Sequence, residues 1–387
     1  MNILVLDGRN RASLQVIRSL SKNRHKIFIG EAFYCSSFLS NKIYKKVSYP
    51  NPDLHPNEFF DKIKNIVIHE NIDFILPIRD STFEILSRRK NELPNNCKVF
   101  IAEINKINLL KRKDSLMKLA KSLGVPIPKT IFLNTEILEY EQIIQKLGSP
   151  FIAKPVLSSG SRGIYLIKNK KDNNRFFLEN PTNDYILQEY IPHGGAIGVH
   201  LLYNDSKIVA FNTHVRIREY PHSGGPSTLR RSGKHKLCEY LSFLLLDKVK
   251  WHGPAMVEFR IDKNKKIPYL MKINPRFWGS LAVDIHSGVD FPNLIIQETF
   301  QDLNNRADNS RRSGVVVRWL FLGDFLWFLT HGNKLAALKQ FLNFKNQKFD
   351  ILSLDDPLPV VGACIEGLVS LMKKSRRDHA FKRGWKI

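Results

Sequence analysis

The sequence predicts a mixed protein of the α/β and α+β classes, in which a parallel sheet precedes a larger body of antiparallel strands. In the first part of the chain, short apolar runs alternate with helical patterns, which is typical of parallel strands joined by right-handed crossovers. In the middle part, apolar runs of strand length follow one another across glycines and short polar loops. That second pattern is typical of antiparallel pairing.

The first part, residues 1–105, is expected to form a Rossmann-like domain. Its predicted strands are residues 3–6, 26–29, 73–78 and 98–101, and its predicted helices are residues 13–20 and 59–69. The turn after the first strand, DGRNRAS, lacks the G-x-G-x-x-G pattern, so a dinucleotide site is not expected there. The turn either joins strand to helix or helps to hold an anionic group at the helix N-terminus.

A second segment begins near residue 105. One helix is predicted at residues 109–123, where the prolines of GVPIPKT end it, and another at residues 237–249. The predicted strands of this segment are residues 151–155, 164–167, 185–188, 200–203, 208–211, 255–261 and 268–274.

The remaining residues, 304–387, are expected to form a helical, basic extension. Its apolar stretch VVVRWLFLGDFLWFLT is predicted to be a helix packed on the body. A membrane span needs about 20 apolar residues, and Arg318 and Asp324 interrupt this stretch. Peripheral membrane contact through the tail KKSRRDHAFKRGWKI is the alternative.

Composition favours a globular, cytoplasmic protein. The chain has 387 residues, of which 43% are hydrophobic, so it can bury a large core. Four widely spaced cysteines fit neither a zinc site nor a disulfide framework, which agrees with a reducing compartment. The net charge of +24 favours anionic partners. Nucleic acid is not expected, because the basic residues are scattered through likely loops and no nucleic-acid module accompanies them.

Two sequence clusters suit a nucleotide. In AKPVLSSGSRG, Lys154 ends a strand and is followed by a loop of small residues whose backbone N–H groups can approach phosphates: Ser159, Gly160, Ser161 and Gly163. In ILQEYIPHGG, Glu189 stands at a strand end beside Tyr190 and Ile191, which suits an adenine slot. Taken singly, each cluster also fits an ordinary hairpin or proline turn.

Two further clusters suit charge chemistry. Adjacent strands in GPAMVEFRID and PYLMKINPRFWGS place Glu258 and Asn274 side by side as oxygen ligands for Mg²⁺, with Arg276 available for a phosphoryl group. The segment RIREYPHSGGPSTLRRS, predicted as a loop between a strand and a helix, carries arginines that either close over an anionic substrate or face solvent: Arg216, Arg218 and Arg230.

In this order, the four clusters resemble the ATP-grasp superfamily, particularly its carboxylate-amine ligase and carbamoyl-phosphate-synthase-like branch. The resemblance implies an ATP-grasp fold with an N-terminal Rossmann-like pre-ATP-grasp domain over residues 1–105. It also implies an ATP-grasp domain over 106–303, with a lid at about 106–190 and a larger lobe at about 191–303. Members of the family activate a carboxylate as an acyl phosphate, which an amine or other nucleophile then attacks.

The resemblance also implies roles for single residues. Lys113, with Lys111 as a neighbouring candidate, and Lys154 resemble the lysines that reach the nucleotide phosphates. Glu189, Tyr190 and Ile191 match the segment that holds adenine. Glu258 and Asn274 match the Mg²⁺ ligands. Arg276 matches the phosphate-side arginine, so Arg276 and Lys154 are the expected catalytic residues.

One departure separates this chain from the family pattern. The family has a glutamate two positions before the asparagine, as in MEINPR, whereas this chain has MKINPR with Lys272 there. An ammonium in place of a carboxylate removes an oxygen ligand and reverses the local charge. The expected activity is an ATP-dependent carboxylate-amine ligase, and the alternative is a nucleotide-binding protein with impaired catalysis. The expected partners are ATP and small carboxylate and amine substrates; family members often form dimers, so a homodimer is a further expectation.

Overall fold

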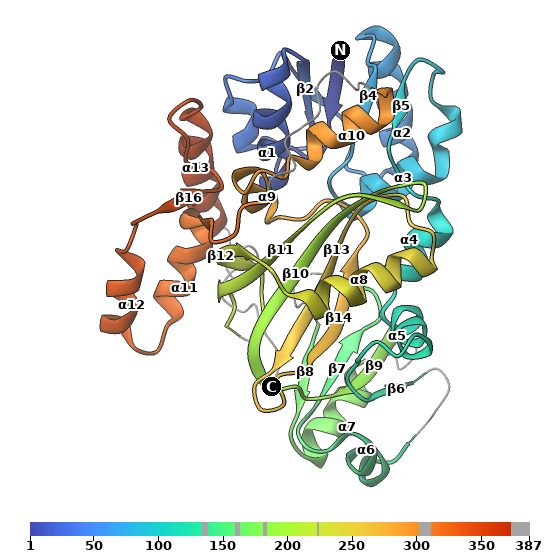
Figure 1. Ribbon diagram of the computed structural model, residues 1–387, viewed down its shortest axis with the longest axis vertical. Coiled ribbons are helices and arrows are strands. Elements are labelled where there is room, and N and C mark those ends of the chain that lie inside the picture. Colours follow the sequence, from blue (N-terminus) through green and yellow to red (C-terminus); the bar gives the residue numbers. More distant parts are fainter. Residues whose placement is uncertain (134–137, 159–162, 181–183, 223, 302–310, 373–387) are drawn as a thin grey trace.

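Three sheets organise the chain in the computed structural model, which describes residues 1–133, 138–158, 163–180, 184–222, 224–301 and 311–372. The sheet near the N-terminus is parallel and the other two are largely antiparallel (Figure 1). The predicted combination of α/β and α+β architecture is therefore confirmed.

The N-terminal sheet has five parallel strands in the order β3-β2-β1-β4-β5. Its strands are β1 (Asn2–Val5), β2 (Lys26–Glu31), β3 (Lys45–Ser48), β4 (Phe74–Leu76) and β5 (Lys98–Val99), with helices α1 (Arg11–Leu20), α2 (Pro56–His69) and α3 (Asp80–Arg89). Strand order reverses between β1 and β4, and ligands of such sheets bind outside the carboxyl ends of the strands at that point.

A buried aspartate shapes this reversal point. Asp7, directly after β1, accepts hydrogen bonds from the backbone N–H groups of Ile78 and Arg79, at 3.0 and 2.8 Å, and from the Thr82 hydroxyl at 2.6 Å. Because those donors follow β4, the carboxylate ties the two strand ends together. These hydrogen bonds hold the start of α1 next to the start of α3, so the first residues of both helices lie at the same edge of the sheet.

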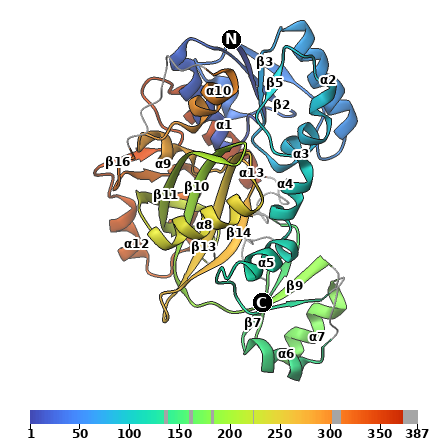
Figure 2. The ribbon, with the colours of Figure 1, turned by 45° about the vertical axis from the view of Figure 1, so that its right-hand side comes forward.

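The smallest sheet is antiparallel, with the order β6-β9-β7-β8, and lies apart from the other two (Figure 2). Its strands are β6 (Thr130–Phe132), β7 (Phe151–Pro155), β8 (Tyr165–Ile167) and β9 (Tyr185–Glu189). The helices α6 (Tyr140–Leu147) and α7 (Lys170–Glu179) belong to the same lobe, and α4 (Ile104–Lys111) and α5 (Lys113–Ser122) lead into it.

The single helix predicted at residues 109–123 is in fact two helices. Arg112 is extended, with ψ of 124°, and separates α4 from α5. The break frees the N–H of Lys113, which donates to the Val156 carbonyl at 3.1 Å. The start of α5 is thereby attached to the chain that follows β7.

The largest sheet has seven strands in the order β14-β13-β10-β11-β12-β15-β16. They are β10 (His193–Asn204), β11 (Lys207–Glu219), β12 (Ser227–Gly233), β13 (Gly253–Asp262), β14 (Pro268–Asn274), β15 (Val316–Arg318) and β16 (Gln347–Phe349). Successive residues of β10 serve opposite faces, as the pleat requires. Leu201 packs in the core of α8 (Lys236–Lys248), and Leu202 in the core of α10 (Phe291–Phe300). The short α9 (Leu281–His286) contacts β12.

Two predictions for this region were wrong. The segment predicted as a basic loop is largely a hairpin, because β11 extends to Glu219 and β12 begins at Ser227. The stretch predicted as a helix starts as β15, whose β-branched valines pair with β12. A kinked turn (Leu320–Asp324), in which Phe321 and Leu322 have non-helical backbone angles, and the helices α11 (Phe325–Thr330), α12 (Lys334–Phe341) and α13 (Leu358–Met372) follow. None of the helices in the described part of the chain is long and apolar enough to span a membrane. The basic tail, which follows residue 372, lies outside the described residues.

Buried aspartates attach the C-terminal segment to the rest of the molecule. Asp350 follows β16 and is 1% exposed. It accepts hydrogen bonds from both terminal nitrogens of Arg230 on β12 and, at 2.6 Å, from Arg11 on α1. Asp356 binds Arg18 on α1 in the same way, at 2.8 Å. The segment therefore bridges the large sheet and the N-terminal sheet.

We predict that Asp350→Asn lowers the free energy of unfolding by about 3–5 kcal/mol, because it leaves the buried Arg230 guanidinium without its counter-charge. Denaturant unfolding followed by circular dichroism measures the change. The control is Asp355→Asn, since Asp355 is exposed. Equal stabilities of the two variants would contradict the bridging role.

Candidate functional site

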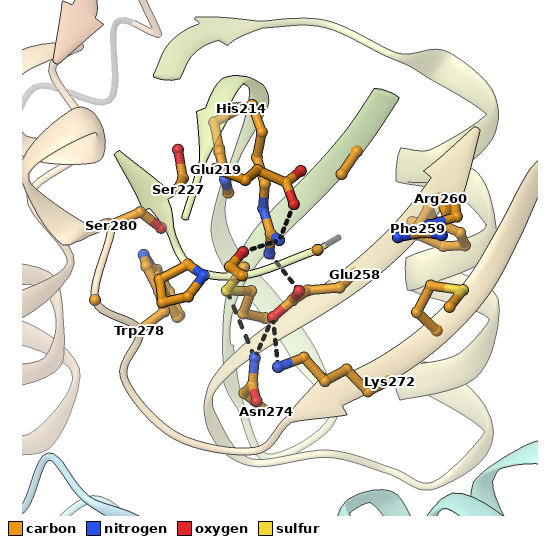
Figure 3. Close-up of a pocket in the computed structure, with 18 of the residues that line it drawn as sticks. His214, Glu219, Ser227, Glu258, Phe259, Arg260, Lys272, Asn274, Trp278 and Ser280 are labelled. Atoms are coloured by element: carbon orange, nitrogen blue, oxygen red, sulfur yellow. Dashed lines mark hydrogen bonds and ion pairs between the residues drawn. The ribbon is translucent and has the colours of Figure 1, made fainter. Parts of the chain in front are cut away.

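A cavity of about 350 Å³ is lined by residues of β11, β13 and β14 of the large sheet and by Lys113 and Lys154. Figure 3 shows part of its lining around Glu258. Six residues singled out from the sequence line the cavity: Lys113, Lys154, Arg216, Glu258, Asn274 and Arg276. A second cavity of about 850 Å³ adjoins it on the side of the N-terminal sheet and shares several of its lining residues. The fold thus brings distant sequence clusters to one place.

Glu258 lies at the centre of the first cavity. Strand register places it opposite Lys272, whose Nζ is 3.1 Å from Glu258 Oε1. The same oxygen accepts a hydrogen bond from Asn274 Nδ2 at 2.7 Å, and Oε2 is paired with Arg216 (Figure 3). Burial raises the pKa of Glu258, but Arg216 and Lys272 lower it by more, so its pKa lies well below the ordinary value.

This arrangement does not fit the metal site that the sequence predicts. Mg²⁺ needs free oxygen ligands in octahedral geometry, and both oxygens of Glu258 already accept hydrogen bonds from neighbouring side chains. Within the described ranges, no group of three or more His, Cys, Asp or Glu side chains could hold a metal ion. Glu258 and Asn274 do lie together as predicted, but they bond to each other beside Lys272.

Two buried lysines line the cavity: Lys113 at the start of α5 and Lys154 on β7. Lys154 Nζ donates to Gln188 Oε1 at 2.8 Å. Lys113 Nζ donates to the carbonyl of Pro155 at 2.8 Å and to the Ser158 hydroxyl at 2.9 Å. No carboxylate is among these partners. Burial lowers the pKa of Lys154 well below its usual value, and burial together with the charge of Lys272 lowers the pKa of Lys113 to about 7.

Comparison with known proteins identifies the domain. The family model described as ATP-grasp domain matches residues 111–280, the segment that contains all six of these cavity residues. The chain contains an ATP-grasp domain. A curated relative, the formate-dependent phosphoribosylglycinamide formyltransferase of Parabacteroides distasonis, is 25% identical over 174 residues. That match covers 45% of this chain and 40% of the relative's length.

Solved structures share the fold of this ATP-grasp protein. Biotin carboxylase of Campylobacter jejuni in complex with β-γ-ATP has a TM-score of 0.66 at 14% identity, over 81% of this chain and 74% of that one. N5-carboxyaminoimidazole synthetase of Staphylococcus aureus with ADP has a TM-score of 0.60 at 15% identity, over 80% of this chain and 78% of that one. At these identities the likeness concerns the fold alone.

Arg276 lies where the ATP-grasp domain meets the N-terminal sheet. It follows β14 and lines both cavities. Its guanidinium is 2.9 Å from Asp80 Oδ2, at the start of α3. Burial raises the pKa of Asp80, but Arg276, Lys111 and Lys272 outweigh that effect, so its pKa is lowered. Lys111, the neighbouring candidate for Lys113, is paired with Glu84.

Two arginines predicted to hold the nucleotide lie elsewhere. Arg218 donates to Asp324 at 2.7 Å and stacks on Trp327 at 4.3 Å, and Arg230 binds Asp350. Neither lines the cavities of the ATP-grasp domain. Arg218 on β11 and Arg230 on β12 are instead paired with acidic groups of the C-terminal segment, whose strand β15 pairs with β12.

The other predicted nucleotide residues lie on or next to the strands of the smallest sheet. Gly163 has φ of +67°, and a β carbon there would come within 2.9 Å of Pro155, so only glycine suits the turn. Glu189 accepts from the Lys129 N–H at 3.0 Å, and Arg260 donates to the Ile191 carbonyl at 3.3 Å. Among the described residues that line the first cavity, none is Gly163, Glu189, Tyr190 or Ile191. Ser159, Gly160 and Ser161 lie outside the described residues.

Sequence reasoning missed a buried polar cluster beside Arg276. His200 and His214 are fully buried on β10 and β11, with ring centroids 4.5 Å apart. His214 lines the cavity (Figure 3). His200 contacts Asp284 and Ser280, which follow the NPRFW segment. A histidine within an apolar strand gives little signal by itself; the serine that ends NPRFWGS could have been singled out.

We predict that affinity for magnesium-free ATP falls as pH rises above about 7, because Lys113 loses its proton in this range. The loss approaches roughly tenfold per pH unit if only the charged form binds. Calorimetric titration at pH values above about 7.5 isolates this effect, because phosphate groups, with a second pKa of about 6, are already ionised. In Lys113→Arg the guanidinium stays charged, so the contribution of Lys113 disappears and the affinity should fall less steeply with pH; an equal pH dependence in both proteins would refute the assignment.

Proposed function

We propose that this ATP-grasp protein is an ATP-dependent ligase that joins a small carboxylate to an amine through an acyl phosphate. The observation that carries the proposal is the convergence of Lys113, Lys154 and Arg276 on one cavity with Glu258 and Asn274. These residues are far apart in the sequence, and the fold brings them to one cavity. The shared fold with nucleotide-bound carboxylases and synthetases supports ATP as the ligand.

The two lysines are suited to a polyphosphate. Lys154 bonds to an amide oxygen and Lys113 to carbonyl and hydroxyl oxygens, so none of these partners is a carboxylate. Burial penalises their charged forms. Phosphate oxygens would supply the missing counter-charge in a partly dry site, where such attraction is strongest. Phosphate binding therefore stabilises the cationic forms of both side chains.

Arg276 is suited to the carboxylate side of the reaction. It lines both cavities, so one guanidinium can face the nucleotide and the second substrate. A planar guanidinium pairs with a carboxylate or a phosphoryl group through two parallel hydrogen bonds. The second cavity also carries Arg9, Arg11 and Arg79, which favours an anionic substrate. The curated relative is named for its dependence on formate, a small carboxylate.

A second candidate function is nucleotide binding with impaired catalysis. It is favoured by the ammonium of Lys272, which lies 3.1 Å from Glu258 Oε1 where the family pattern has a carboxylate. Phosphoryl transfer depends on metal ions that bridge the β and γ phosphates, and a lysine cannot replace two such ions. The two candidates differ in turnover and agree on nucleotide binding.

We predict that ADP release requires a carboxylate and rises further with an amine. The assay measures ADP and phosphate from ATP with magnesium, against a panel of small carboxylates alone and with amino acids. Arg276→Lys keeps the positive charge but loses the bidentate geometry, so it should lower turnover by about 10²–10³-fold. ATP binding without ADP release from any pair in the panel would favour the second candidate, and absence of both would refute the proposal.

We predict that Lys272→Glu raises magnesium-dependent affinity for ATP by about 1–3 kcal/mol, because it restores an oxygen ligand beside Glu258. Calorimetry with and without Mg²⁺ measures the gain. Lys272→Gln is the matched control, since it removes the ammonium without adding a carboxylate. If neither variant responds to magnesium, the placement of Lys272 at the metal position is wrong.

A further inference from the structure

A hydrogen-bonded chain of serine, histidine and aspartate begins at the wall of the first cavity. Ser280 lines the cavity on the loop that follows β14 (Figure 3). Its Oγ is 3.2 Å from His200 Nε2, and His200 Nδ1 is 2.7 Å from Asp284 Oδ1. The three groups come from two separate segments, β10 and the loop and helix after β14, so the fold assembles them.

The aspartate at the far end is held firmly. Trp278 Nε1 donates to Asp284 Oδ2 at 2.7 Å, and Asn212 Nδ2 donates to Oδ1 at 2.8 Å. The indole of Trp278 also stacks on the His200 ring, with centroids 4.1 Å apart. His200 and Asp284 are fully buried, whereas Ser280 is 8% exposed. The chain therefore has one end at the cavity and its other end in the protein interior.

We propose that Ser280 is a nucleophile activated by His200 and Asp284, able to take an acyl group within the cavity. A serine hydroxyl becomes reactive when a histidine accepts its proton and a carboxylate orients that histidine. Here, Nδ1–H of His200 directed at Asp284 leaves Nε2 to accept the Ser280 proton. Ser227 also lines the cavity, but its hydroxyl donates to the Leu229 carbonyl and has no histidine partner.

The step is placed within the proposed ligase reaction and rests on it. Ser280 Oγ attacks the carbonyl carbon of the acyl phosphate, the bond from that carbon to the phosphate oxygen breaks, and inorganic phosphate leaves. The serine proton passes to His200 Nε2 and on to the departing phosphate. The amine then attacks the ester carbonyl and gives a proton to His200 Nε2; the bond from the carbonyl carbon to Ser280 Oγ breaks, that proton passes to Ser280 Oγ, and the amide leaves. No oxidant or further reactant is needed.

Cationic groups line the same cavity as Ser280. Arg11 lies against Gly279, the residue before Ser280, where a β carbon would be 3.2 Å from the guanidinium. Arg276 lies on the same loop and lines the same cavity. Positive charge at this position can stabilise the oxyanion that develops as Ser280 attacks. Asp350 holds Arg11 at 2.6 Å and positions it there.

The test is covalent labelling by methanesulfonyl fluoride, a small reagent in which a serine oxygen displaces fluoride from sulfur. The full-length protein is incubated without ATP at a pH of about 9, above the pKa of Asp284, which burial raises to about 8. Intact mass and peptide mapping report the rate and the site. We expect one methanesulfonyl group on Ser280. His200→Asn and Asp284→Asn should each slow labelling by at least about 10²-fold, and Ser227→Ala should leave it unchanged.

Folding and nucleotide binding are checked on the same preparations by circular dichroism and ATP calorimetry. If the histidine and aspartate variants do not fold, Ser280→Ala and Ser280→Cys replace them, and the former must abolish the label. Absence of label from folded protein, label on Ser227 at an equal rate, or labelling that is insensitive to His200→Asn overturns the proposal. Because the assay contains no ATP, carboxylate or amine, its outcome is independent of whether the ligase function holds.

Discussion

The position of Asp350 between Arg11 and Arg230 is the interaction on which the assembly of the site depends. One buried carboxylate contacts the first helix of the parallel sheet and the fifth strand of the large sheet, while its own backbone belongs to the C-terminal segment. Burial raises the pKa of Asp350, but the two guanidinium groups outweigh that effect and keep it low. This charged contact therefore holds the three parts of the chain together. If Asp350 is removed, the arginines stay buried without a counter-charge, which destabilises the fold.

The cavity that this assembly frames is unusual in its charge. It contains one central carboxylate, Glu258, and that carboxylate is shared among Arg216, Lys272 and Asn274. The lid side adds Lys113 and Lys154, whose partners are neutral oxygens. A site of this kind favours anionic ligands and has few groups that favour divalent cations.

Much of this could be predicted from residues whose role depends on local pattern. The parallel sheet followed from alternating apolar and helical segments, and the cavity residues Lys154, Glu258, Asn274 and Arg276 followed from motif spacing. The destinations of Arg218 and Arg230 could not be predicted in this way, because they depend on a strand that pairs from nearly ninety residues away, as Arg318 opposite Leu229 shows. The His200 and Asp284 contact depends similarly on the packing of α9 against the sheet, which no local pattern encodes.

Because Arg276 is paired with Asp80, an anionic ligand of Arg276 competes with a carboxylate of the protein itself. The arginine belongs to the ATP-grasp domain and the aspartate to the first helix after β4 of the N-terminal sheet, and they are 2.9 Å apart. An anion that binds the Arg276 nitrogen paired with Asp80 competes with that carboxylate, so its apparent affinity there is its intrinsic affinity scaled by the fraction of molecules in which that nitrogen is released. A displaced Asp80 is then a carboxylate at the cavity rim, which would attract a cationic ammonium. Under the proposed ligase function, binding of the carboxylate would in that way prepare the entry of the amine, and a single ion pair would set the order of substrate addition.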